Sequence, residues 1–234
     1  KNVVVCGSLK FDISPNVSQV AAARDWKNRL SRPVALVAST RAGEELQFAQ
    51  ALAQNSELKR RMLTVIVPRH PERFDTVYSL LTQKGLKVCR RSALRDASDI
   101  PADTDVVLGD SMGEMSFYFA LSDMVAMGGS FEPFGCQNVI EPALAGSPVI
   151  VGPSVYNFDK IVRDGRSAGA MVQVPDVPSA MRQFERWLDQ PVERVMASEA
   201  ALKFASEYAG ATQRMMSLLE GIWNKAQKNT SSMP

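Results

Sequence analysis

The sequence predicts an α/β fold in which helices cover both faces of a doubly wound parallel sheet. Two observations lead to it. Along the 234 residues, short apolar runs rich in β-branched residues alternate with longer stretches of helical pattern. The runs are apolar at consecutive positions, which is typical of strands buried on both faces of a parallel sheet. A chain of this length forms one large domain or two small ones.

Seven segments have the pattern of such strands, and helical patterns lie between them. The predicted strands are 33–38, 63–67, 87–89, 106–108, 124–127, 149–151 and 171–174. The predicted helices are at about 15–29, 43–55, 71–84, 113–121, 137–145 and 158–164, followed by a long helical stretch at 192–227 in which Gly210 is a candidate break. The polar residues 228–234 predict a disordered tail.

The composition is that of a soluble domain with a large core. Hydrophobic residues make up 45% of the chain and charged residues 22%, and no apolar run approaches the roughly 18 residues of a membrane helix. A net charge of +2 with scattered basic residues gives no reason to expect a nucleic-acid partner. Cys6, Cys89 and Cys136 show no paired spacing, which favours neither a disulfide framework nor a zinc site and indicates a reducing compartment.

Polar motifs follow several of the predicted strands. Residues 39–45 follow the first main strand, Arg69 and His70 follow the second, residues 109–114 follow a later one, and a glycine-rich segment begins at Gly128. In a doubly wound sheet, ligands gather beyond the carboxyl ends of the strands, where successive connections leave toward opposite faces. We therefore expect these four connections to converge on one crevice.

The segment 128–153, GGSFEPFGCQNVIEPALAGSPVIVGP, is the most informative of the four. Glycines such as Gly129 let a backbone approach a phosphate or a sugar, and the free amides of a helix that opens near Asn138 attract an anion. Ser130 can donate a hydrogen bond, and Glu141 can accept hydrogen bonds from sugar hydroxyls. An ordinary strand-to-helix connection with glycines at its turns is the alternative, because glycine motifs alone are weak signals.

Five motifs between residues 7 and 158 together resemble the bacterial 3-deoxy-D-manno-octulosonic acid (Kdo) transferases, which move Kdo from CMP-Kdo onto the lipid A precursor. They are GSLKFD, where the family has GNLKFD, then STRAGEE, PRHPERF, GDSMGEM and GGSFEPFGCQNVIEPALAGSPVIVGPSVYNF, in the family's order. Two positions depart from the family pattern: Cys136 stands where glycine is usual, and Gln137 where histidine is common. The departure leaves position 137 without an assigned role.

The resemblance implies a GT-B glycosyltransferase, built of two Rossmann-like halves, of which this chain corresponds to the carboxyl-terminal, donor-binding half. We expect residues 1–12 to be an interdomain connection and residues 13–227 to be the donor-binding domain with its terminal helix. The amino-terminal half, with its membrane anchor, is then absent from this sequence. In such enzymes the terminal helix often crosses to the other half, which would leave part of its apolar face exposed here; a helix packed wholly on its own domain is the alternative.

The resemblance also assigns candidate donor-binding residues in STRAGEE and PRHPERF. In STRAGEE, Ser39 and Thr40 become candidate contacts, although either can simply cap a helix whose first turn carries Glu44. Arg69 and His70 are candidate partners of a phosphate or carboxylate. The competing interpretation is that His70, the only histidine of the chain, is structural.

In GDSMGEM, the backbone at Met112, Gly113 and Glu114 is expected to recognise the flat edge of cytosine. A plain strand-to-helix turn capped by Asp110 or Ser111 is compatible with that role. With Ser39, Thr40, Arg69, His70, Gly129, Ser130, Asn138 and Glu141, these residues complete the predicted donor site. No catalytic residue, metal ligand or cofactor is predicted within the chain.

The implied reaction is inverting and independent of metal, and its base is expected in the amino-terminal half. We expect this chain to bind CMP or CMP-Kdo with negligible transferase activity. The intact enzyme would act at the cytoplasmic face of the bacterial inner membrane, and it would meet the lipid A precursor and the membrane only through the other half. Two alternatives stay open: a stand-alone nucleotide-binding regulatory module, and another GT-B enzyme that uses a UDP-sugar.

Overall fold

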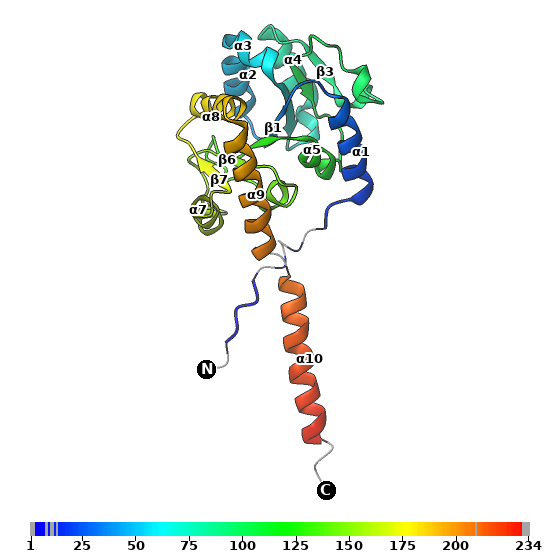
Figure 1. The fold of residues 1–234 in the computed structure, drawn as a ribbon, viewed down its shortest axis with the longest axis vertical. Coiled ribbons are helices and arrows are strands. Elements are labelled where there is room, and N and C mark those ends of the chain that lie inside the picture. Colours follow the sequence, from blue (N-terminus) through cyan, green and yellow to red (C-terminus); the bar gives the residue numbers. More distant parts are fainter. Residues whose placement is uncertain (1–2, 8, 10–11, 13, 209, 231–234) are drawn as a thin grey trace.

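A seven-stranded parallel sheet forms the centre of the molecule, with helices on both sides (Figure 1). The computed structural model describes residues 3–7, 9, 12, 14–208 and 210–230. The strands are β1 (Val34–Thr40), β2 (Leu63–Pro68), β3 (Val88–Arg90), β4 (Val106–Leu108), β5 (Met124–Met127), β6 (Val149–Val151) and β7 (Met171–Gln173). Their order across the sheet is β3-β4-β2-β1-β5-β6-β7. The predicted doubly wound parallel sheet is confirmed, and each predicted strand lies within one or two residues of an observed one.

Ten α-helices lie in the part of the chain that the structure describes. They are α1 (Val17–Arg29), α2 (Glu44–Gln54), α3 (Ser56–Arg61), α4 (Phe74–Gln83), α5 (Met115–Leu121), α6 (Ile140–Leu144), α7 (Asp159–Ser167), α8 (Val177–Asp189), α9 (Pro191–Tyr208) and α10 (Ala211–Thr230). Short 3₁₀ turns lie at Pro71–Arg73, Arg91–Ala93 and Ala97–Asp99. The sequence prediction missed α3 and α8, and Gly210 with φ +84° separates α9 from α10.

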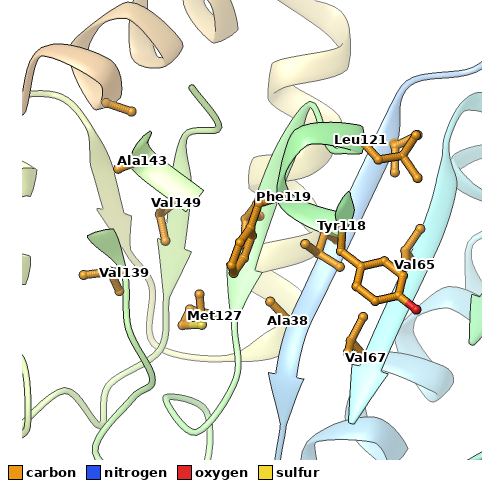
Figure 2. Close-up of a cluster of buried hydrophobic side chains, with 14 of the residues drawn as sticks. Ala38, Val65, Val67, Tyr118, Phe119, Leu121, Met127, Val139, Ala143 and Val149 are labelled. Carbon is orange, nitrogen blue, oxygen red and sulfur yellow. The ribbon is translucent and has the colours of Figure 1, made fainter. Parts of the chain in front are cut away.

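The strands are apolar at every position because each face of the sheet has its own core. Alternate residues of β1 point to opposite faces, so Leu36 belongs to one core cluster and Val37 to the other. The cluster around Leu36 is covered by α1, α5, α6, α7 and α9, and the cluster around Val37 by α2, α3, α4 and α8. In the first cluster, Tyr118 of α5 lies over Val65 and Val67 of β2 (Figure 2). This two-sided burial is what the continuous apolar runs predicted.

The strand order reverses between β1 and β5, and this position fixes where a ligand can bind. The two strands are paired, with Leu36 opposite Val125 and Ala38 opposite Met127. After β1 the chain enters α2 on one face of the sheet, whereas after β5 it runs through the glycine-rich loop to α6 on the other face. Because the two connections diverge, they leave a crevice at the carboxyl ends of the strands.

The end of the chain forms a helix that projects from the α/β body (Figure 1). Asp12 caps α10 by accepting hydrogen bonds from the amides of Gly210, Ala211 and Thr212, and bonds from Thr212 above all lower the pKa of Asp12 to about 2. Ile222 and Trp223 are 65% and 66% exposed, so α10 is not packed wholly on its own domain. No helix in the described part of the chain has both the length and the apolarity for crossing a membrane.

The described residues include only parts of the two predicted end segments. Helix α10 continues to Thr230, so it takes in residues 228–230, for which disorder was expected; residues 231–234 lie outside the described residues. Alanine, glutamine and lysine near the end of α10 are strong helix formers, which favours this continuation. The predicted interdomain connection, residues 1–12, is described only at 3–7, 9 and 12.

Gly128, directly after β5, is predicted to tolerate no side chain. A Cβ at this position would lie 2.5 Å from the carbonyl oxygen of Ser39 and 2.7 Å from that of Ala38, and both are backbone atoms that cannot rotate away. We expect Gly128→Ala to lower the free energy of unfolding by about 1–3 kcal/mol through overpacking. Urea denaturation followed by circular dichroism measures this loss.

The matched control is Gly221→Ala in α10, where a Cβ would meet nothing within 4 Å. In an exposed helix this change is expected to favour the helix by about 1 kcal/mol or less. A Gly128→Ala variant as stable as the unmodified chain would show that β1 and β5 are not packed as closely as described.

Candidate functional site

A pocket of about 330 Å³ opens where the connections after β1, β2, β4 and β5 meet. Six of the predicted site residues line it: Ser39, Arg69, Met112, Gly113, Asn138 and Glu141. Five others, Thr40, His70, Glu114, Gly129 and Ser130, are not among its lining residues. The four connections therefore converge as expected, and the convergence brings Asn138 and Glu141 to the same pocket as Met112 and Arg69.

Ser39 reaches the pocket because of an irregularity in β1. In the pairing with β2, Ala38 lies opposite Val67 and Thr40 opposite Pro68, so Ser39 is an extra residue in β1. Its φ of +55° is in the left-handed region, which is uncommon for a residue other than glycine. A bulge of this kind re-aims a side chain at the end of a strand.

Glu141 and Asn138 form the wall contributed by the glycine-rich segment. The Asn138 amide nitrogen donates to Glu141 Oε1 at 3.1 Å, and Asn138 Oδ1 accepts from the backbone amide of Ile140 at 3.0 Å. Burial raises the pKa of Glu141, while the bond from Asn138 and the charge of Arg69 act against the rise. The Ile140 amide, at the start of the helix, is thus already used by Asn138. Among the residues that line the pocket, Arg69 carries the positive charge that acts on Glu141.

Met112 and Gly113 form an exposed edge of the pocket. Met112 is 66% exposed, and Gly113 has a φ of +75° with its carbonyl accepting from the side chain of Gln19 at 2.8 Å. The Glu114 side chain does not line the pocket. It pairs with Arg91 at 2.9 Å and accepts from the hydroxyl of Ser111, which does line it.

The remaining predicted residues lie next to the pocket with their polar groups engaged inside the protein. The Thr40 hydroxyl is buried and donates to Glu45 at 2.7 Å. The buried Ser130 hydroxyl donates to the carbonyl of Met127 and accepts from the amide of Gly152 at 2.7 Å. His70 Nε2 lies 2.8 Å from the guanidinium of Arg41.

The lining residues that were not predicted are Val67, Pro68, Phe74, Ser111, Met115, Phe119, Met127 and Gln137. Five of these belong to motifs already singled out: Pro68 and Phe74 to PRHPERF, Ser111 and Met115 to GDSMGEM, and Gln137 to the glycine-rich segment. Their position in a motif could have identified Phe74 and Ser111 as candidates. The sequence does not show in which direction each side chain points.

The described residues contain no group of three or more His, Cys, Asp or Glu side chains that could hold a metal ion. The cysteines Cys6, Cys89 and Cys136 are free. Burial raises the pKa of the Cys136 thiol to about 12, so this thiol is neutral near pH 7. The polar side chains that line the pocket belong to Ser39, Arg69, Ser111, Gln137, Asn138 and Glu141.

A buried ion pair fixes the turn that carries Phe74. Glu45 is 1% exposed, and its two carboxylate oxygens accept from Arg73 at 2.7 and 2.9 Å. We expect Arg73→Met to lower the free energy of unfolding by about 3 kcal/mol, the lower end of the range for breaking a buried pair, because Arg73 is 23% exposed. Arg163→Met, which breaks the exposed pair with Asp159, is expected to cost about 1 kcal/mol or less. Equal losses in chemical denaturation of the two variants would contradict this.

Comparison with known proteins agrees with the geometry. Residues 84–204 match the sequence pattern of the family described as "Glycosyl transferases group 1". The chain is 41% identical over 219 residues to a 3-deoxy-D-manno-octulosonic acid transferase of Bordetella pertussis, an alignment that covers 92% of this chain and 51% of the relative. It is 32% identical over 222 residues to the enzyme of that name from Haemophilus influenzae, with the same coverage. The chain thus spans about half the length of these relatives.

Among solved structures, the chain resembles the C-terminal CMP-Kdo binding domain of WaaA from Acinetobacter baumannii. The TM-score is 0.75 and the sequences are 33% identical, with the alignment covering 81% of this chain and 98% of that domain. The fold prediction, the carboxyl-terminal half of a GT-B glycosyltransferase, is confirmed. The chain belongs to the group 1 glycosyl transferases and, within them, to the family of the Kdo transferases.

Proposed function

We propose that this chain is the donor-binding part of an enzyme that transfers Kdo from CMP-Kdo to the lipid A precursor in lipopolysaccharide biosynthesis. The observation that carries the proposal is one pocket at the carboxyl edge of the sheet, to which four motifs contribute Ser39, Arg69, Met112, and the pair Asn138 and Glu141. The similarity to a domain named for binding CMP-Kdo supports the same ligand. The donor, with one phosphate and one carboxylate, offers two anions to Arg69.

The size and lining of the pocket suggest which part of the donor lies inside it. At about 330 Å³ the pocket is at the lower end of the roughly 300–1,000 Å³ of small-molecule sites. We infer that the nucleotide occupies it, with cytosine at the edge formed by Met112 and Gly113. The phosphate then lies toward Arg69, and sugar hydroxyls lie toward Asn138 and Glu141. Kdo would project from the pocket, where an acceptor can reach it.

The proposed reaction is an inverting displacement. An acceptor hydroxyl oxygen forms a bond to the anomeric carbon of Kdo, the bond from that carbon to the phosphate oxygen breaks, and its electron pair leaves with CMP. Arg69 stabilises the negative charge that develops on the phosphate, the kind of electrostatic assistance that lowers such barriers. The hydroxyl proton passes to a base outside this chain, so the chain alone binds the donor without transferring it.

The proposed setting of the whole enzyme is the cytoplasmic face of the bacterial inner membrane, with the lipid acceptor held outside this chain. The proposed reaction uses no metal and no further cofactor, because a single phosphate leaves with its charge balanced by Arg69. Two other functions would show themselves in the binding test below. A UDP-sugar enzyme would prefer UDP, and a regulatory module would bind CMP without any preference for CMP-Kdo.

Isothermal titration calorimetry on this chain tests the nucleotide assignment. We expect CMP to bind more tightly than UMP or UDP, and CMP-Kdo more tightly than CMP. Arg69→Met should weaken CMP binding by about tenfold or more, the loss typical of one charge-assisted hydrogen bond. Lys160→Met is the matched control, because Lys160 is 78% exposed, pairs with Asp164 and does not line the pocket. A preference for UDP would overturn the proposal.

Glu141→Gln is predicted to raise the stability of the chain at neutral pH while it weakens binding of the donor. The pKa of Glu141 is raised in the folded chain, chiefly by burial, so its ionised form opposes folding at neutral pH. The variant should therefore be more stable than the unmodified chain at pH 7. The difference should shrink as pH falls through the raised pKa and vanish below the ordinary pKa of glutamate, where the carboxyl is neutral in both states.

The glutamine of the Glu141→Gln variant keeps an oxygen for Asn138 but loses the charged acceptor, so the affinity for CMP-Kdo should fall by about tenfold. Melting temperatures between pH 4 and pH 8, together with titrations at neutral pH, check both parts. A variant that loses stability at pH 7 would show that the folded chain holds the ionised carboxylate favourably.

A further inference from the structure

We propose that Glu44 is a positioning residue: without lining the pocket, its carboxylate holds the loop that begins at Gly128 so that Gln137, Asn138 and Glu141 face the ligand. The sequence allowed Glu44 only an ordinary place in the first turn of a helix. The expectation that Glu44 affects CMP binding rests on the proposed function. The expectation that Glu44 holds the loop does not.

The Glu44 carboxylate lies between the two connections that diverge from the sheet. Glu44 is the first residue of α2 and is fully buried. Its Oε2 accepts from the backbone amides of Arg41 at 2.7 Å and Gly129 at 2.8 Å, and its Oε1 accepts from the amide of Phe131 at 2.9 Å. One bond is local, and two reach a loop 85 and 87 residues further along the chain.

A helix cap would not need this arrangement. Gly43 is the N-cap of α2 and makes no side-chain cap bond, and Glu44 reaches back only to Arg41. A fully buried carboxylate is costly unless hydrogen-bond donors surround it, and the two amides of the loop supply most of them. The Gly129 and Phe131 amides therefore depend on Glu44 as their acceptor, and the Glu44 carboxylate depends on these amides as donors.

The effect of Glu44 passes along the loop to the pocket. The Gly129 carbonyl accepts from the amide of Cys136 at 2.7 Å, and Gln137 and Asn138, which line the pocket, follow directly. Cys136 has a φ of +71°, a conformation that a residue other than glycine adopts only when its surroundings impose it. The bond from the Cys136 amide to the Gly129 carbonyl ties this residue to Gly129, whose own amide donates to Glu44.

The test combines ligand binding with amide hydrogen exchange on the whole chain. In Glu44→Gln, one oxygen can still serve Arg41 and Gly129, but an amide group faces the Phe131 N–H. In Glu44→Ala all three bonds are lost. We expect exchange in residues 128–139 to quicken in Glu44→Gln and more in Glu44→Ala, while β1 and β2 stay protected. CMP affinity should fall in the same order, by about tenfold for Glu44→Gln, the equivalent of one charged hydrogen bond.

Glu132→Gln is the matched control. Glu132 is in the same loop and its carboxylate accepts from the side chain of Gln47 at 2.6 Å, so the variant removes the same charge without removing a bond to the loop backbone. We expect its loop exchange and CMP affinity to equal those of the unmodified chain. A variant that merely loosened the fold would quicken exchange in β1 and β2 as well, which the proposed role excludes.

Each outcome decides the inference. Unchanged exchange of residues 128–139 in Glu44→Gln would overturn it, and so would quickened exchange with unchanged CMP affinity. If the unmodified chain binds no CMP, the proposed function fails and loop exchange alone decides for or against Glu44. If Glu44→Ala does not fold, Glu44→Gln with its control still gives the answer.

Discussion

The buried carboxylate of Glu44 is the interaction on which the geometry of the pocket depends. The reversal of strand order at β1 and β5 sends one connection to each face of the sheet, and topology alone leaves the two loops unattached. Glu44 joins them, because it begins the helix after β1 and accepts from two amides of the loop after β5. The crevice between diverging connections becomes a pocket with a fixed wall.

The next residue, Glu45, fixes a second wall by the same means. Consecutive residues of a helix point about 100° apart, so two adjacent carboxylates can serve different neighbours. Glu44 turns to the glycine-rich loop, and Glu45 turns to Arg73 and Thr40. Burial is the main cause of the raised pKa of Glu44, and the neighbouring charge of Glu45 adds to it. Backbone amides on Glu44 counter the rise in part, and the Arg73 guanidinium pairs with Glu45, so the two carboxylates can be buried side by side.

The sequence determined the sheet and the edge of the site more clearly than the direction of individual side chains. Continuous apolar runs located every strand, and the motifs after them located the pocket. Helix α8 was missed although Asp176 and Pro178 mark its start and Ala180, Phe184 and Trp187 form its buried stripe. Ser39 and Thr40 are neighbours, yet only Ser39 lines the pocket, because a bulge turns it outward. No local pattern shows a bulge, since it depends on the register with β2.

The same limit explains why the sequence did not distinguish the hydroxyl and carboxylate residues that line the pocket from those held inside the protein. Ser130 and Thr40 have the chemistry of ligand contacts, but their hydroxyls form hydrogen bonds inside the protein. Ser130 donates to the carbonyl of Met127, and Thr40 donates to the carboxylate of Glu45. Glu141 has the opposite balance: burial disfavours its charge, and Asn138 and Arg69 offset this only in part. Polar groups that the fold satisfies build the pocket, whereas a half-buried carboxylate such as that of Glu141, which accepts from Asn138, has capacity for a ligand. Ser130 and Thr40 thus differ from Glu141 in how fully their polar groups are bonded within the protein, and the sequence does not show this difference.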